Sequence, residues 1–128
     1  MSRRKSIYVA GASHTNPIPA AARVGPVLMS GIVSGPNAHD GRRPASLEAQ
    51  CENMFRNVRA IVEAAGGSTD DIVKLTVYLA DPGNREVLNR HWLAMFPDPD
   101  NRPARQVMPN PPNGQWAILC DFVAHIEG

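Results

Sequence analysis

Two segments of the chain carry apolar residues at helical spacing. In residues 47–65 the apolar positions recur every three or four residues, which predicts an amphipathic helix with a single apolar stripe. Ser46 is placed to cap the first turn of this helix, and Gly66 with Gly67 provides a left-handed stop. A second helix is predicted over residues 85–96, with its large apolar residues on one side.

Five further segments are predicted to be strands, and one of them, residues 72–79, is rich in β-branched residues. They lie at residues 6–10, 27–33, 72–79, 104–108 and 116–126. Clusters of proline separate most of these elements and mark the turns between them. Gly31 falls within the second strand, where a glycine indicates a bulge or the close approach of another group to the backbone.

The last predicted strand, residues 116–126, has two largely apolar faces. Alternate residues place on one face Trp116, Ile118, Cys120, Phe122, Ala124 and Ile126. The opposite face carries Leu119 and Val123 beside a single carboxylate, Asp121. A helix layer can cover only one face of a sheet, so the second apolar face is expected to meet another subunit.

The order of the predicted elements is strand, strand, helix, strand, helix, strand, strand. Each helix connects two strands, and right-handed connections place both helices on the same face of the sheet. The sequence therefore predicts a single domain over residues 1–128, a two-layer α+β sandwich with a mixed β-sheet and two helices on one face. A chain of 128 residues is long enough to bury a core of its own.

Composition argues against several kinds of partner. The formal net charge is +1 and aromatic residues make up 5% of the chain, so nucleic acid is not expected to bind. No apolar run approaches the roughly 20 residues that span a bilayer. No apolar segment typical of a signal peptide follows the basic first residues. We therefore expect a cytoplasmic protein without a membrane partner.

The cysteines and histidines give no sign of a disulfide or a metal site. Cys51 and Cys120 lie in apolar segments and are expected to be buried, reduced thiols. The four histidines show no metal-ligand spacing, so no metal is expected.

Several short motifs occur together in a specific order and spacing. They are Ser30 with Gly31, residues 63–67 (E-A-A-G-G), residues 71–79 (D-I-V-K-L-T-V-Y-L), Asp81, residues 87–89 (V-L-N), Phe96 and residues 102–105 (R-P-A-R). Over nearly its whole length the chain resembles the RidA (YjgF-type) enamine/imine deaminase family. The resemblance implies a chorismate-mutase-like fold and a homotrimer with ligand sites between subunits. It also implies hydrolysis of enamines and imines to 2-oxo acids and ammonia, without cofactor or metal.

Arg105 and Asp121 match the positions that the resemblance implies for catalysis. A guanidinium binds a carboxylate through two parallel hydrogen bonds, and a 2-imino acid carries a carboxylate beside the carbon that water attacks. We therefore expect Arg105 to bind the carboxylate. The alternative interpretation is that Arg105 is an ordinary surface arginine. Asp121 is expected to position water and handle a proton, where the family usually has a glutamate. Its alternative role is a structural ion pair.

The resemblance also indicates residues around the ligand. Ser30 and Gly31 match a position that lines the pocket, although Ser30 also fits an ordinary strand serine. Many imine-hydrolysing members have a tyrosine where this chain has Ile18, and often a cysteine where this chain has Val107. We therefore expect Ile18 and Val107 to give a more apolar pocket for a different substrate, with His14 and Asn16 as candidate polar groups.

Three functions are compatible with these residues. The first is hydrolytic deamination of small enamine or imine carboxylates, with a 2-aminomuconate-type deaminase in a catabolic pathway as a variant. The second is a non-catalytic module that binds small carboxylates and regulates a partner, for which Arg105 alone would suffice. The third is a ribonuclease or translation inhibitor, a label sometimes given to the family, which the net charge of +1 argues against.

Overall fold

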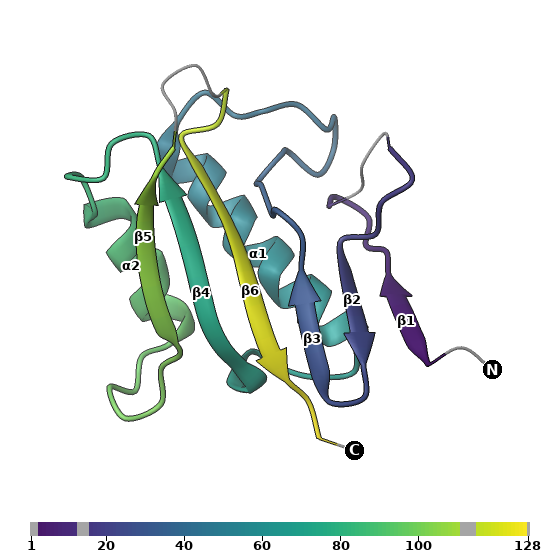
Figure 1. Ribbon diagram of the computed structural model, residues 1–128. Coiled ribbons are helices and arrows are strands. Elements are labelled where there is room, and N and C mark those ends of the chain that lie inside the picture. Colours follow the sequence, from purple (N-terminus) through teal and green to yellow (C-terminus); the bar gives the residue numbers. More distant parts are fainter. Residues whose placement is uncertain (1–2, 13–15, 111–114, 128) are drawn as a thin grey trace.

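The computed structural model describes residues 3–12, 16–110 and 115–127, and it shows a six-stranded sheet with two helices behind one face (Figure 1). The strands are β1 (Arg4–Ile7), β2 (Ala21–Val24), β3 (Val27–Ser30), β4 (Ile72–Leu79), β5 (Ala104–Pro109) and β6 (Ile118–His125). The helices are α1 (Leu47–Ala64) and α2 (Glu86–Met95), with a short 3-10 helix, Thr69–Asp71, before β4. This is the predicted two-layer α+β sandwich.

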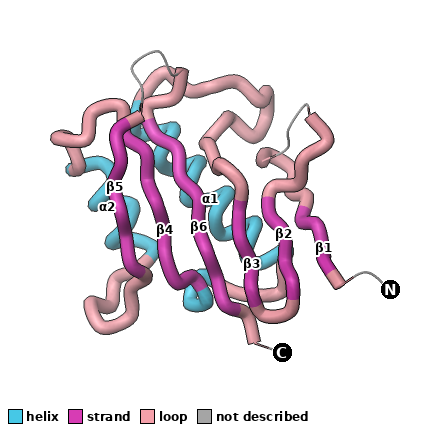
Figure 2. Tube along the Cα trace, viewed as in Figure 1, coloured by secondary structure: helices cyan, strands magenta, loops and turns pink. Residues whose placement is uncertain are grey.

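The last strand of the chain lies inside the sheet, because the strand order is β1-β2-β3-β6-β4-β5. Strands β4 and β5 are parallel and the other neighbours are antiparallel, so the sheet is mixed. Both helices lie behind the same face, which we call the helix face, as right-handed connections require. In Figure 2 no described element covers the opposite face, which we call the open face.

The strands differ from the prediction in several places, among them β3, which ends at Ser30 rather than at 33. Strand β2 has no predicted counterpart, so the sheet has six strands rather than five. It pairs with β3 across a two-residue turn, in which Gly25 has a φ of 56°. Strand β1 lies at Arg4–Ile7 instead of 6–10, because pairing with β2 fixes its position. Strand β6 begins at Ile118 rather than at 116.

Strand β2 is tied to the helix layer by Arg23. Its Nη1 donates a hydrogen bond of 2.6 Å to the carbonyl of Ala65, at the end of α1. Its Nη2 donates to the carbonyl of Ile126 at 3.5 Å. One side chain therefore satisfies carbonyls from two elements, including one of those that a helix C-terminus leaves unpaired.

Helix α1 begins and ends as its sequence predicts. The hydroxyl of Ser46 accepts the N–H of Ala49 at 3.1 Å. At the other end Gly66 has a φ of 95°, and Gly67 donates its N–H to the carbonyl of Val62 at 2.9 Å. This is the left-handed glycine stop of a Schellman motif. No described helix is long and apolar enough to cross a membrane.

The core lies between the helices and the helix face of the sheet. Val58 and Ile61 of α1 are fully buried, as is Leu75 of β4. Burying such a side chain contributes roughly 1.5–3 kcal/mol. Cys51 and Cys120 are buried free thiols, which confirms the prediction. Burial raises the pKa of Cys51 to about 12, so this thiol is not a nucleophile at neutral pH.

Candidate functional site

Arg105 lies on β5, an edge strand, with its side chain on the helix face. Its register partner on β4 is the buried Leu75, and its guanidinium carbon lies 5.0 Å from the ring centre of Trp92 on α2. The Nη1 atom is buried and has no hydrogen-bond partner among the described residues. A buried charged donor without a partner is costly, so this atom favours the binding of an anion.

The electrostatic surroundings of Arg105 also favour an anion. Burial lowers the pKa of Arg105, and the positive charge of Arg85 lowers it further. A guanidinium stays protonated at neutral pH in spite of such a shift. Arg105 and Arg85 therefore both contribute positive charge around the Arg105 guanidinium. A carboxylate would supply both the missing hydrogen-bond acceptor and a compensating charge.

Val107 is the next side chain of β5 on the helix face. It pairs with Val77 of β4 and packs against the hydrophobic core. Two residues along a strand span about 6.6 Å. A group that extends along β5 from Arg105 therefore meets an apolar side chain rather than a polar one.

Asp121 lies on the open face, and one protomer therefore does not bring it to Arg105. Its neighbours along β6 are buried under the helices. Its Oδ2 accepts a hydrogen bond of 3.0 Å from the hydroxyl of Tyr78 on β4. This bond raises the pKa of Tyr78, and burial adds to the effect. The carboxylate thus has the partner that it needs among apolar neighbours, and Tyr78 joins the candidate site residues.

Ser30 has a structural role within one protomer. Past Met29 the pairing of β3 with β6 resumes only at Val33, and β3 uses one residue more than β6 to reach it. This is the β-bulge that the sequence indicated. The hydroxyl of Ser30 accepts the N–H of Phe122 at 2.8 Å and donates to the carbonyl of Gly31 at 2.8 Å. The Ser30 hydroxyl therefore replaces a backbone hydrogen bond of the sheet. Its single hydrogen is already donated to Gly31.

Gly31 and Ile18 are both exposed to solvent in the single chain. A Cβ added to Gly31 would lie 3.8 Å from the carbonyl oxygen of Ala20, which is an ordinary contact. Nothing within the described protomer therefore requires a glycine at this position. Ile18 precedes β2, and 48% of it is exposed. Of the two candidate polar groups, His14 lies outside the described residues and Asn16 is exposed.

A cavity of about 330 Å³ opens at the end of the sheet where β3 leaves β6. Its walls include the apolar side chains of Ile32, Val33, Pro36, Ile61, Trp116 and Leu119. None of the predicted site residues lines this cavity, although Ile32 directly follows Gly31. The cavity and Arg105 are therefore separate features of the protomer.

The walls of the cavity are held by three buried amides of α1, which we call the amide row. They are Gln50, Asn53 and Asn57. The side-chain nitrogen of Asn57 donates to the carbonyls of Gly11 and Ser34, at 3.2 and 2.9 Å. The side-chain oxygen of Gln50 accepts the N–H of Ala117 at 2.9 Å. The prediction from sequence missed this row, although its members recur at helical spacing beside the apolar stripe.

The predicted site residues do not converge within one protomer. Arg105 and Val107 lie on the helix face of β5, and Asp121 lies on the open face of β6. Ser30 ends β3, which is three positions from β5 in the sheet, or about 14 Å. Among the described residues, no three His, Cys, Asp or Glu side chains are grouped so that they could hold a metal ion.

Comparisons with known proteins agree with this fold. The chain matches the family model described as Endoribonuclease L-PSP over residues 5–110. A RutC family protein of Haemophilus influenzae is 36% identical over 104 residues, which cover 72% of this chain and 78% of the relative. The 2-iminobutanoate/2-iminopropanoate deaminase of Escherichia coli is 42% identical over 60 residues, and this match spans 47% of each chain.

A solved structure shows the same architecture over almost the full length. RidA from the Antarctic bacterium Psychrobacter sp. superposes with a TM-score of 0.84 at 29% identity, covering 95% of this chain and 99% of that one. This architecture agrees with the sequence motifs and with these matches about the family of the chain. The chain belongs to the RidA (YjgF-type) family, which the Endoribonuclease L-PSP model describes.

Proposed function

We propose that this protein hydrolyses small enamine or imine carboxylates to 2-oxo acids and ammonia, with Arg105 binding the carboxylate. The observation that carries the proposal is the buried Nη1 of Arg105, which lacks a partner among the described residues. Membership of the family and the partial match to the Escherichia coli deaminase support the same class of reaction.

The role of Arg105 follows from the chemistry of a 2-imino acid. Water adds to the carbon of the C=N bond, and the tetrahedral product loses ammonia when the C–N bond breaks, which leaves the 2-oxo acid. The carboxylate is attached to this same carbon, so a fixed carboxylate also fixes the carbon that reacts. A guanidinium stays protonated, and Arg105 therefore orients the substrate rather than taking a proton from water.

Asp121 is the residue that we propose for positioning the attacking water and accepting its proton. Arg105 and Asp121 lie on opposite faces of one sheet, so they can act on one substrate only if two copies supply them. We therefore propose a homotrimer with its sites between subunits, in which neighbouring copies cover the open face. In this assembly Gly31, Ile18 and Val107 are the proposed lining of the ligand site.

The separation of Arg105 and Asp121 also favours a second candidate, a non-catalytic module that binds small carboxylates. Arg105 with Trp92 offers a cationic site on the helix face without any contribution from Asp121. In the first candidate carboxylate binding is followed by attack of water, and in the second it is the whole function.

The test measures ammonia release from 2-imino acids generated in situ from several amino acids, above the spontaneous rate. We expect Arg105→Ala to lower kcat/KM about 10- to 100-fold, because hydrogen bonds to charged groups contribute roughly 1.5–3 kcal/mol. Asp121→Ala is expected to lower kcat. Arg59→Ala, at an exposed position of α1, is the matched control and should leave the rate unchanged.

Each outcome separates the candidates. Equal activity of Arg105→Ala and wild type would exclude the proposed site. If wild type accelerates no 2-imino acid and still binds 2-oxobutanoate through Arg105, the binding module is the function.

A further inference from the structure

The guanidinium of Arg105 is held by an aromatic ring rather than by hydrogen bonds. Its Nη1 has no hydrogen-bond partner among the described residues, and its guanidinium carbon lies 5.0 Å from the ring centre of Trp92. This distance is within the range of a cation–π interaction, for which tryptophan is the best aromatic partner. A cation–π interaction requires no N–H donor of the guanidinium, and Nη1 of Arg105 has no partner among the described residues.

The ring of Trp92 is itself fixed by its surroundings. Trp92 is 8% exposed, and its ring centre lies 4.8 Å from that of Phe96, with the planes tilted by 59°. Phe96 is fixed in turn, because its carbonyl accepts a hydrogen bond of 2.8 Å from Nε of Arg102. The end of α2 therefore presents a buried, packed pair of aromatic rings on the side of β5.

We infer that Trp92 is a positioning residue for Arg105, whose guanidinium it holds in place so that the free donors meet the carboxylate of the substrate. This inference rests on the proposed function. A free arginine side chain populates many rotamers, and fixing one of them costs entropy. A guanidinium that is ordered before binding loses less of this entropy when the carboxylate arrives, so the affinity is higher.

The charge of Arg85 opposes the placement of the Arg105 guanidinium. It lies near enough to act on the guanidinium of Arg105, and like charges repel. The negative face of the indole offsets part of this repulsion, which a purely apolar side chain of similar size cannot do. Trp92→Leu and Trp92→Phe therefore separate the electrostatic contribution of the ring from its bulk.

The test measures the Kd of 2-oxobutanoate, together with KM and kcat, for wild type, Trp92→Leu and Trp92→Phe. We expect Trp92→Leu to weaken binding about three- to tenfold, the usual size of a cation–π contribution. KM should rise by a similar factor with kcat nearly unchanged, because the lost interaction is made in the ground state and the transition state alike. Trp92→Phe keeps an aromatic face and should recover most of the affinity.

Val58→Ala is the control for a general loss of stability, because Val58 is a fully buried residue of α1 outside the proposed site. The inference is overturned if Val58→Ala raises Kd as much as Trp92→Leu does, or if Trp92→Phe is as defective as Trp92→Leu. It is also overturned if Arg105→Ala abolishes binding while Trp92→Leu leaves it intact. Full binding by Arg105→Ala would instead refute the proposed function.

Discussion

The two charged residues of the candidate site differ in how the folded chain satisfies them. Asp121 accepts a hydrogen bond of 3.0 Å from Tyr78, whereas Arg105 has a buried donor without an acceptor among the described residues. A group that lacks a partner gains most from a ligand that supplies one. Ligand affinity should therefore depend on Arg105 more than on Asp121, and a role of Asp121 should appear in the chemical step.

The hydrogen bond between Tyr78 and Asp121 can be tested through the titration of the Tyr78 hydroxyl. Its effect raises the pKa of Tyr78, so Asp121→Asn should lower that pKa, because a neutral amide does not oppose the phenolate charge. Since the folded-state pKa is raised, the associated stability is present below the unfolded pKa of tyrosine and is lost as pH rises through the folded value.

The measurement is the tyrosinate absorbance in a Tyr8→Phe background, which leaves Tyr78 as the only tyrosine. The same background without a change at Asp121 is the control. Identical titration curves with and without Asp121→Asn would contradict the assignment of this hydrogen bond.

Among the elements, α1 combines an apolar stripe with the amide row. The stripe packs on the sheet, and the amide row binds the backbone of three loops that surround the cavity. Buried amides are tolerated only when they are hydrogen-bonded, so each fixes the loop that it contacts. The shape of the cavity therefore depends on a helix that contributes only one of its named lining residues, Ile61.

Gly35 is the point at which one of these loops touches α1. A Cβ there would meet the carbonyl oxygen of Gln50 and lie 2.6 Å from the backbone nitrogen of Met54. These are backbone atoms that cannot turn aside, so we expect Gly35→Ala to lower the free energy of unfolding by about 1–3 kcal/mol. Urea denaturation measures this loss.

Gly83→Ala is the matched control for Gly35→Ala. At Gly83 the nearest atom to an added Cβ is 3.5 Å away, which is an ordinary contact. Equal midpoints of unfolding for the two variants would show that the loop can move away from α1.

The same elements show what the sequence could and could not predict. Helix α1 was predictable to within one residue because its stripe, its serine cap and its glycine stop all indicate the same bounds. Strand β2 (A-A-R-V) was not, because two alanines and an arginine have little strand propensity, and only the turn at Gly25 marked it. The residues of the site were found by resemblance. Their arrangement was not, because the faces of the short strand β5 and the partner of Asp121 depend on pairing between distant segments.

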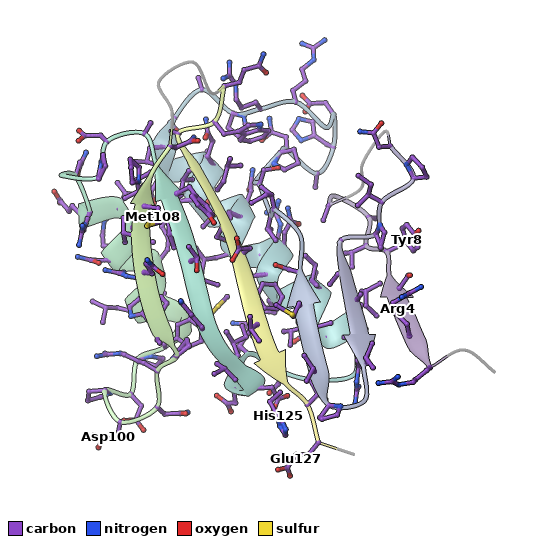
Figure 3. The ribbon with its side chains drawn as sticks, viewed as in Figure 1. Arg4, Tyr8, Asp100, Met108, His125 and Glu127 are labelled. Carbon is purple, nitrogen blue, oxygen red and sulfur yellow. The ribbon has the colours of Figure 1, made fainter. Side chains whose placement is uncertain are left out.

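At the scale of the whole molecule, the open face carries apolar side chains that the single chain leaves in contact with solvent. Met29 of β3 is 56% exposed, and Met108 of β5 is also exposed (Figure 3). Leu119 and Val123 of β6 are half-buried between them. Apolar side chains exposed on an uncovered sheet face favour an interface, which supports the proposed homotrimer.

A charge placed on the open face should prevent assembly. We expect Met29→Asp to give monomers in light scattering, because an unpaired carboxylate in an interface is costly. Leu93→Asp on α2 is the control, since Leu93 has a similar exposure of 49% and lies in the helix layer. A wild-type monomer, or a Met29→Asp variant of unchanged mass, would contradict the proposed assembly.

The central place of β6 has a consequence for the synthesis of the protein. Strands β1 to β3 and strands β4 and β5 form two groups that only β6 joins, and β6 follows all of them in the chain. While the ribosome is still producing β6, the nascent chain has two partial sheets with unpaired edges. Such edges are prone to aggregate. The two partial sheets can therefore join into one only after β6 has left the exit tunnel.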